Sequence, residues 1–431
     1  MRYFSLNHNA PEVSFKEGVI NGLAPDKGLY FPKDIQPLSK DFFEHIENLD
    51  KVSIAYEAIK QFVGAEIAEA DLKHIVEQAI NFDFPVVDVE ENIASLELYH
   101  GPTMAFKDVG ARFMARCLGY FYKDNPNENV TVLVATSGDT GGAVASGFLG
   151  VKGVNVVILY PSGKVSNVQE KQLTTLGKNV TAIEVNGTFD DCQAMVKQAF
   201  LDDELRTAFK LTSANSINIA RWLPQMFYYF FAYKALKHKQ KDVVFAVPSG
   251  NYGNICAGMM AQKLGLPIYH FVTGTNANNV VPHYLKTENY NTKASVQTIS
   301  NAMDVGAPSN FIRIQELHNN DFNTLKHNLS GYSYSDAETL AAINSLNDKF
   351  NYIADPHGAI GYLALKAYLK DKPKKQGVFL ETAHPIKFLP VMPKHLLEQI
   401  KVPSHIEELL KKEKKSIVIS NYDELKKTLI K

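Results

Sequence analysis

The sequence predicts an α/β protein built on open parallel sheets, and three observations point to this class. Short apolar runs rich in β-branched residues recur without polar alternation, as in strands that are buried on both faces of a sheet. Segments with helical spacing lie between these runs, which is the order typical of parallel α/β sheets. Small-residue loops follow three of the runs, namely TSGDTGG, PSGK and PSGNYGN. Because ligands of such sheets bind at the carboxyl ends of the strands, these loops predict a ligand site at that edge.

The strands and helices are expected in chain order. The runs expected to be strands are Asn129–Thr136, Val154–Tyr160, Asn179–Val185, Val243–Val247 and Gly377–Glu381. After the fourth run, apolar residues recur at three- and four-residue intervals from Ile255 to Leu264, and Gly265 with Pro267 ends the pattern, which predicts a helix. Ser166 and Gln169 form a candidate capping box that would begin another helix. We interpret the lysine-rich run near the C-terminus, LLKKEKKS, as one solvated face of a helix.

Composition favours small-molecule partners. The chain of 431 residues is long enough for two or three domains, and 45 Lys plus Arg balance 46 Asp plus Glu, so no global positive field attracts nucleic acid or anionic membrane. The three cysteines are too far apart for a zinc site or a disulfide framework. No secretory leader is evident, and no apolar run approaches the ~20 residues of a membrane span. We therefore expect a soluble cytoplasmic protein, a monomer or small homo-oligomer, without a metal site.

The loop SGNYGN, residues 249–254, has the character of an anion site. Its glycines allow close approach of the backbone to a ligand, and the following helix directs unpaired N–H groups and its positive dipole end toward the loop. An ordinary β–α turn with no ligand is the alternative. The chain lacks both G-x-x-x-x-G-K-[ST] and a strand-linked G-x-G-x-x-G, so ATP and NAD are disfavoured. The remaining candidate ligand is a phosphorylated cofactor or substrate that is bound by backbone amides and does not depend on a metal.

Lys107 occupies an unusual place, just before a helix predicted from Val109, Phe113, Cys117 and Phe121 with Asp108 as N-cap. The positive end of the helix dipole and desolvation by Phe106 and Met104 both disfavour an ammonium, so we expect a lowered pKa and a nucleophilic amine. A lysine that only snorkels at a helix end is the alternative. Combined with the phosphate loop, however, an amine able to form a Schiff base matches what pyridoxal phosphate requires.

At this point the residues resemble a known family, the threonine synthases. The opening VSFKEGVINGLAPDKGLYFP resembles the longer bacterial and fungal branch, and the similarity extends to about Pro393, with the C-terminal tail matching poorly. Six motifs occur in the family's order and approximate spacing: HGPTMAFKDVGARF, ATSGDTGGAVASGF, SANSINIARW, VPSGNYGN, NAMDVGAPSNF and ETAHPIKF.

The resemblance implies a fold type II pyridoxal phosphate enzyme, similar to the β subunit of tryptophan synthase, with helices on both faces of open sheets and an added N-terminal unit. Its reaction would convert O-phospho-L-homoserine and water to L-threonine and phosphate by γ-elimination and β-addition, as a carbon–oxygen lyase at the last step of threonine biosynthesis. Another fold type II lyase, such as a serine or threonine dehydratase or a phosphoamino-acid phospholyase, is the closest alternative, and a non-catalytic relative is a second one. We expect an N-terminal unit at 1–95, a region carrying Lys107 and SGDTGG at 96–236, and a region carrying SGNYGN and a helical tail at 237–431, with segments that interleave.

The resemblance also assigns site residues. Lys107 falls on the Schiff-base lysine, and Thr382 falls on the hydroxyl that faces the pyridine nitrogen, where a neutral partner does not enforce a protonated ring. Asp139 falls where shorter-branch members carry an asparagine near the cofactor's 3-hydroxyl. The cofactor-phosphate loop would be Gly250, Asn251, Tyr252, Gly253 and Asn254. For the substrate's own phosphate the candidates are Ser162, Lys164, Ser213, Asn215 and Arg221. Arg221 is equally compatible with a structural ion pair, and the residues around Lys164 with a simple helix start.

Overall fold

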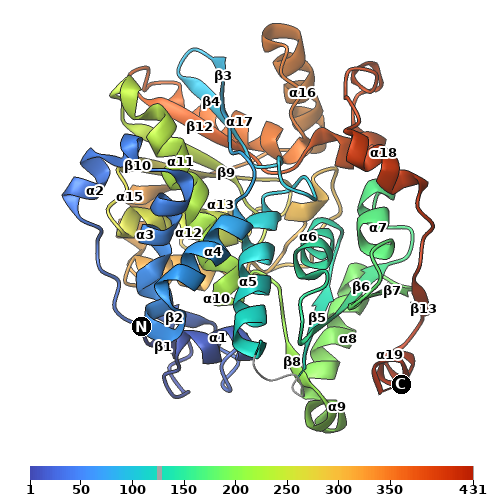
Figure 1. The fold of residues 1–431 in the computed structure, drawn as a ribbon. Helices are drawn as coiled ribbons and strands as arrows, with labels where there is room; N and C mark the ends of the chain where they lie inside the picture. The colour runs from blue at the N-terminus through green and yellow to red at the C-terminus, as the bar shows by residue number, and fades with distance from the viewer. Residues whose placement is uncertain (124–128, 431) are drawn as a thin grey trace.

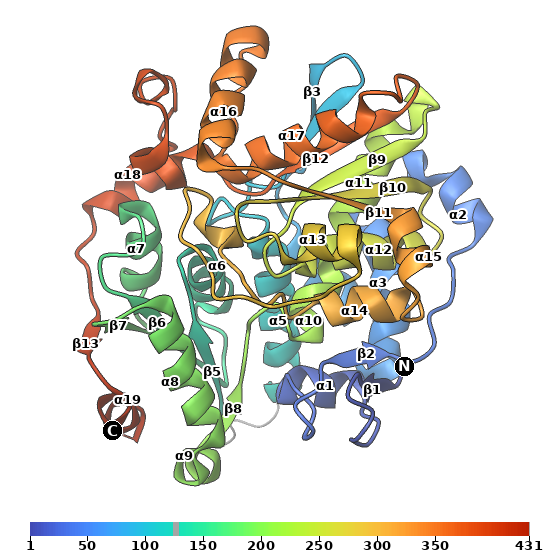
Figure 2. The same cartoon turned by 180° about the vertical axis from the view of Figure 1, so that it is seen from behind.

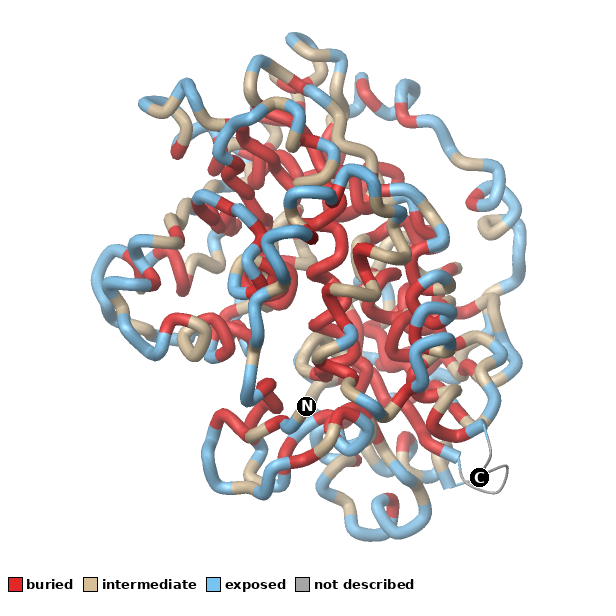
Figure 3. Tube along the Cα trace, turned by 60° about the vertical axis from the view of Figure 1, so that its left-hand side comes forward, coloured by how far each residue is buried: buried red, intermediate tan, exposed pale blue. Residues whose placement is uncertain are grey.

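A computed structural model describes residues 1–123 and 129–430. Two open sheets with helices on their faces form the body of the protein, and blue N-terminal elements cover one side of it (Figure 1). Buried stretches gather in the middle of the molecule, and exposed segments lie around them (Figure 3). The α/β class predicted from the buried runs is therefore confirmed. None of the helices in these residues is long and apolar enough to cross a membrane.

The smaller sheet has five parallel strands in the order β13-β7-β6-β5-β8. Three of the strands expected from apolar runs lie next to one another in this sheet. The bounds are β5 Val130–Ala135, β6 Val154–Pro161, β7 Val180–Val185, β8 Lys210–Thr212 and β13 Ile417–Ile419. The two short edge strands, β8 and β13, were not expected, because three residues are too few to form a recognisable apolar run.

The larger sheet has six strands in the order β11-β10-β9-β12-β4-β3, and only β3 runs antiparallel to its neighbour. The two expected runs, β9 and β12, are central and paired with each other. The bounds are β3 Val86–Glu90, β4 Ile93–Glu97, β9 Val243–Pro248, β10 Ile268–Thr275, β11 Leu329–Ser333 and β12 Gln376–Glu381. A separate antiparallel pair, β1 (Tyr3–Ser5) and β2 (Tyr30–Pro32), belongs to the N-terminal elements.

Helices connect and cover these strands (Figure 2). The helix expected after the fourth run is α12, and the expected capping box of Ser166 and Gln169 begins α7. The bounds are α1 Phe15–Asn21, α2 Lys40–Glu44, α3 Lys51–Val63, α4 Glu69–Ala79, α5 Lys107–Tyr122, α6 Asp139–Phe148, α7 Asn167–Thr174, α8 Phe189–Leu201, α9 Asp203–Ala208, α10 Ile219–Trp222, α11 Phe227–Leu236, α12 Gly253–Lys263, α13 Val280–Thr287, α14 Phe311–Leu317, α15 Phe322–Asn328, α16 Asp336–Phe350, α17 Pro356–Leu369, α18 Ser404–Lys411 and α19 Tyr422–Ile430.

The C-terminal tail crosses from the larger sheet to the smaller one. After β12 the chain passes through α18, adds β13 to the edge of β7, and ends in α19, drawn in red along one side of Figure 1. The interpretation of the lysine-rich run as a helical face was wrong, because α18 ends at Lys411 and the following residues are extended. Lys414 instead binds the carboxylates of Glu170 and Glu184, each at 2.7 Å. These two contacts fasten the tail to the smaller sheet.

Helix α5 is held between α6 and α10 by glycines that permit close contact. A Cβ atom placed on Gly147 of α6 would lie 3.1 Å from the carbonyl carbon of Ala111 in α5. A Cβ atom on Gly110 of α5 would lie 2.3 Å from the backbone oxygen of Arg221. Because these neighbours are backbone atoms that cannot rotate away, the position of α5, and of Lys107 at its start, depends on the absence of side chains there.

We therefore predict that Gly110→Ala destabilises the protein by about 2–3 kcal/mol, since the added methyl group forces α5 and α10 apart. Gly119→Ala, about two and a half turns further along α5, is the matched control, because its Cβ would approach only the Val151 side chain, at 3.1 Å. Its effect should stay within about 1 kcal/mol, as helix propensity favours alanine. Urea unfolding of both variants measures the difference. Equal stability of the two variants would contradict the packing argument.

Candidate active site between the two sheets

Lys107 is placed by backbone pairing between the loop before α5 and the segment after β12. The Phe106 N–H donates to the Thr382 carbonyl at 2.9 Å, and the His384 N–H donates to the Met104 carbonyl at 3.1 Å. These bonds bring Lys107 beside the carboxyl end of β12.

The expected N-cap was wrong, because α5 begins at Lys107 and has no side-chain cap. The Asp108 carboxylate instead accepts hydrogen bonds from the Thr103 N–H at 2.9 Å and from the Thr103 hydroxyl at 2.6 Å.

The environment of Lys107 disfavours its ammonium form. Burial is the largest influence and lowers the pKa of Lys107 to about 8, in agreement with the desolvation expected from the sequence. The Asp139 carboxylate raises this pKa, whereas the positive charges of Lys387 and Arg221 lower it further. The amine lies 4.5 Å from the centre of the Phe106 ring, one of the residues expected to desolvate it. A pKa of about 8 leaves about a tenth of Lys107 as the unprotonated amine at pH 7, far more than in a solvated lysine, and a nucleophile or base requires this form.

Asp139 is buried at the start of α6 and is paired with a second lysine, Lys387. The Lys387 amine lies 2.7 Å from Asp139 Oδ1, and the Gln169 side-chain amide donates to the same oxygen at 2.9 Å. Burial alone would raise the pKa of Asp139, but Lys387 and Lys107 hold it well below its usual range. The carboxylate is therefore ionised. Sequence reasoning missed Lys387, although a lysine inside the otherwise apolar PIKF stretch of ETAHPIKF was the available signal.

The loop from Gly250 to Asn254 joins β9 to α12 and has the features of an anion site. None of its five backbone N–H groups has a hydrogen-bond acceptor within residues 1–123 and 129–430, although Tyr252, Gly253 and Asn254 are buried. Tyr252 adopts a left-handed conformation, with φ of 62°, which turns the chain into the helix. Buried N–H groups without partners at a helix N-terminus are suited to a phosphate, so these donors fit the phosphate of pyridoxal phosphate.

A second segment, η5 (Asn301–Met303) with the residues that follow it, supports this loop from outside. The Ser309 N–H donates to Asn251 Oδ1 at 2.5 Å, and the Asn310 side chain donates to the Asn251 carbonyl at 3.1 Å. The Asn251 side chain donates to Ser216 Oγ at 2.9 Å. The motifs NAMDVGAPSNF and SANSINIARW therefore meet at the loop. The role of Ser216, Ser309 and Asn310 in holding the loop was not assigned from sequence, because side chains that hold a loop carry no local pattern of their own.

Thr382 lies at the end of β12 with a buried side chain, and its hydroxyl has no hydrogen-bond partner in the described residues. The preceding residue, Glu381, is fully buried, and burial together with the charge of Asp355 raises its pKa well above the usual range. Thr382 thus presents a free neutral hydroxyl near Lys107.

The candidates for a second anion site differ in their surroundings. The Ser162 hydroxyl donates to Glu184 Oε1 at 2.7 Å, and Lys164 is exposed in the loop after β6. Ser213 Oγ accepts from the Asn215 N–H at 3.3 Å, near the start of α10. The structure therefore does not bring Ser162 and Lys164 into contact with the other three residues.

Arg221 differs from these because it is a buried cation without an anionic partner. No carboxylate lies within 4.0 Å of its guanidinium in the described part of the chain. One guanidinium nitrogen donates to the Ala214 carbonyl, and its buried Nε has no partner. Burial lowers its pKa to about 10, so Arg221 remains charged at neutral pH. Of the two interpretations of Arg221, the described residues favour the anion site over a structural ion pair.

Comparison with known proteins gives consistent matches along the chain. Residues 90–381 match the model of the family described as pyridoxal-phosphate dependent enzyme. Residues 2–80 match the threonine synthase N terminus and residues 358–430 the threonine synthase C-terminal region. The expectation that the C-terminal tail matches poorly was therefore wrong.

Individual proteins match over nearly their whole length. The threonine synthase of Buchnera aphidicola is 44% identical over 413 residues, which is 95% of each chain. The crystal structure of threonine synthase from Escherichia coli superposes with a TM-score of 0.90 at 40% identity, covering 100% of this chain and 99% of that one. The structure of threonine synthase from Brucella melitensis with bound pyridoxal phosphate has a TM-score of 0.92 at 33% identity, covering 100% and 98%.

We predict that Gly250→Ala weakens binding of pyridoxal phosphate at least about tenfold, the loss expected for charge-assisted hydrogen bonds. The added Cβ would lie 2.8 Å from both the Ala302 oxygen and the Met303 Cα, so the loop must shift away from η5. Absorbance titration of the full chain stripped of cofactor measures this affinity. Pyridoxal, which lacks the phosphate, is the control ligand, and its affinity should change far less. An equal loss for both ligands would argue against a phosphate site at this loop.

Proposed function

Because this chain belongs to the threonine synthase family, we propose that it converts O-phospho-L-homoserine and water to L-threonine and phosphate with pyridoxal phosphate as cofactor. The observation that carries the proposal is the meeting of two features at one edge of the larger sheet. These are the amine of Lys107, whose pKa is lowered to about 8, and the unpartnered N–H groups from Gly250 to Asn254. Each suits one end of pyridoxal phosphate, its aldehyde and its phosphate.

The cofactor-binding roles follow from these surroundings. Gly250, Asn251, Tyr252, Gly253 and Asn254 would hold the phosphate through their backbone N–H groups. Asp139 would lie near the 3-hydroxyl and Thr382 would face the pyridine nitrogen, where its neutral hydroxyl accommodates an unprotonated ring. When bound, pyridoxal phosphate withdraws electrons from the substrate and so makes its α-proton acidic.

Lys107 would act as the base at the substrate. With the substrate bound, Lys107 Nζ would take the proton from Cα, because burial already disfavours the ammonium form. The same nitrogen can return a proton before threonine leaves. Proton transfer by a single lysine also explains why its pKa must lie near the working pH, since both of its protonation states are used in each cycle.

The substrate's phosphate would bind Arg221, with Ser213 and Asn215 beside it. A buried guanidinium without a carboxylate partner stabilises a dianionic leaving group more strongly than a solvated one would, because the local dielectric is low. Ser162 and Lys164 remain more distant candidates that would attract the substrate from the surface. Loss of the γ-phosphate would require removal of a second proton, from Cβ, and Cγ would then gain a proton. Water would supply the hydroxyl at Cβ, and a proton returned to Cα would complete threonine.

The comparisons disfavour the alternative lyases. The N-terminal and C-terminal matches are to threonine synthases in particular and extend beyond residues 90–381, which match the pyridoxal phosphate enzymes in general. We further propose a cytoplasmic monomer or small homo-oligomer that binds no nucleic acid. A formal net charge of −1 and three buried free cysteines support this proposal.

The first test is the product assay. The purified protein should release phosphate and threonine in equal amounts from O-phospho-L-homoserine, and Lys107→Ala should lower kcat about 10³-fold. Borohydride treatment of the holoenzyme followed by peptide mass analysis should find the cofactor on Lys107. Lys426→Met, which removes a lysine of α19, is the control with unchanged kcat. Release of a keto acid from serine or threonine, without threonine formation, would favour a dehydratase instead.

The second test addresses Arg221. Arg221→Gln should raise KM for O-phospho-L-homoserine at least about tenfold, the loss of one charged hydrogen bond, and should also lower kcat. Arg112→Gln on α5 is the matched control, because this arginine binds the Gln78 carbonyl and Asn81, away from the site. Steady-state kinetics with both variants measures the effect. An unchanged KM in Arg221→Gln would assign the phosphate to other residues.

A further inference from the structure

We propose that Lys387 is a positioning residue that neutralises the Asp139 carboxylate, and that this pairing leaves Lys107 as the free amine of the site. The role deepens the proposed function, since it rests on Lys107 being the reactive amine. Lys107 and Lys387 both lie near the Asp139 carboxylate. Only Lys387 forms an ion pair with it.

Lys387 is committed to Asp139 by its geometry. Its side chain is fully buried within η6 (Pro385–Val391), and the exposed fraction of the Asp139 side chain is 4%. The 2.7 Å contact between them excludes water, and Lys387 also donates to the Thr103 carbonyl at 2.8 Å. A buried carboxylate is stable only when it is paired and hydrogen-bonded, and Lys387 meets both needs.

Lys107 has no such partner. Within the described residues no carboxylate lies within 4.0 Å of its amine, and its close neighbour is the Phe106 ring. A buried amine with no anion at hydrogen-bonding distance loses its proton more readily than one in an ion pair. The two lysines therefore differ in their access to Asp139, which only Lys387 reaches at ion-pair distance.

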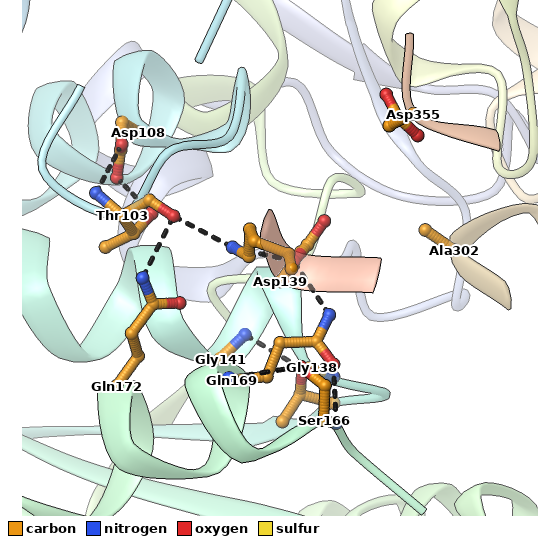
Figure 4. Close-up of polar contacts among 12 residues, drawn as sticks. Thr103, Asp108, Gly138, Asp139, Gly141, Ser166, Gln169, Gln172, Ala302 and Asp355 are labelled. Atoms are coloured by element: carbon orange, nitrogen blue, oxygen red, sulfur yellow. Dashed lines mark hydrogen bonds and ion pairs between the residues drawn. The ribbon is translucent and has the colours of Figure 1, made fainter. Parts of the chain in front are cut away.

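A hydrogen-bonded frame keeps Asp139 turned toward Lys387. Figure 4 shows Asp139 beside Gln169, whose amide donates to Oδ1, with Thr103 close to Gln172 and Asp108. The Gln172 side chain and Lys387 share the Thr103 carbonyl as acceptor. Gln169 is itself fixed, since its carbonyl oxygen accepts from the Ser166 N–H at 3.0 Å. Rotation of Asp139 toward Lys107 would break its contacts with both Lys387 and Gln169.

The charges around Lys107 give the sign of the effect. Burial lowers its pKa most; Asp139 and Asp355 raise it, and Lys387 and Arg221 lower it. Removing Lys387 alone removes one lowering charge and frees Asp139 to pair with Lys107, so both changes raise the pKa of Lys107. Removing Asp139 alone leaves Lys387 as an uncompensated cation and lowers it. Removing both Lys387 and Asp139 takes away one lowering and one raising charge, so the pKa of Lys107 should change little.

The test is competitive acetylation of Lys107 across pH in the full chain stripped of cofactor. Acetic anhydride reacts with the unprotonated amine only, and peptide mass analysis reports the extent at Lys107. The wild-type midpoint is expected at about pH 8. In Lys387→Met it should rise by about one pH unit or more, the usual effect of an opposite charge nearby. In Asp139→Asn it should fall, and in the double variant it should return close to the wild-type value.

Lys426→Met is the control, since it breaks an ion pair with Asp202 of 2.8 Å without touching the site. Its midpoint for Lys107 should equal that of the wild type. Circular dichroism identifies folded variants, and if Lys387→Met does not fold, Asp139→Asn and the double variant carry the test. A midpoint that stays unchanged in the folded single variants, or moves in the same direction in both, overturns the proposal. Because neither cofactor nor substrate is present, this result is independent of the product assay.

Discussion

The site depends on the cost of burying charge. Asp139, Lys387 and Arg221 are buried and Lys107 is partly buried, and an isolated charge in such surroundings is costly. The four groups resolve this cost in three ways. Asp139 and Lys387 pair, Lys107 gives up part of its positive charge, and Arg221 stays charged without an anion. The Asp139–Lys387 pair suits positioning, the partly deprotonated Lys107 suits proton transfer, and the unpaired Arg221 suits anion binding.

The glycines explain how so many groups share so small a region. Gly110 lets α5 approach the Arg221 backbone, and Gly250 lets the phosphate loop lie against η5. Gly138, with φ of 134°, begins α6 immediately before Asp139 and packs on the Gln169 side chain. In each place a side chain would have to occupy space already taken by backbone or by a fixed amide. Close backbone approach is therefore a condition for bringing the charged residues together.

The sequence predicts the parts of this site that have a local signature. The buried strands β5, β6, β7, β9 and β12 form apolar runs, and the SGNYGN loop combines glycines with a following helix, so these features were predicted. The buried strands β4 and β10 were not among the predicted runs. Lys387 was missed because its partner, Asp139, lies far away in the chain, and only the fold shows that they meet. The Asp108 cap failed because a carboxylate at a helix start can also bind a preceding residue, here Thr103. The short edge strands β8 and β13 form only by pairing with strands that lie elsewhere in the chain, so a short stretch of sequence does not predict them.

A chain of buried groups links the two halves of the site. The Asp355 N–H donates to Glu381 Oε1 at 2.5 Å, and His357 contacts Asp355 Oδ1 through Nδ1, also at 2.5 Å. The Ala302 N–H donates to His357 Nε2 at 3.2 Å, so Nε2 carries no proton and Nδ1–H points to Asp355. Ala302 in turn lies against Gly250 of the phosphate loop. Glu381 directly precedes Thr382, and the position of that hydroxyl is thereby tied to the position of the loop through His357 and Asp355.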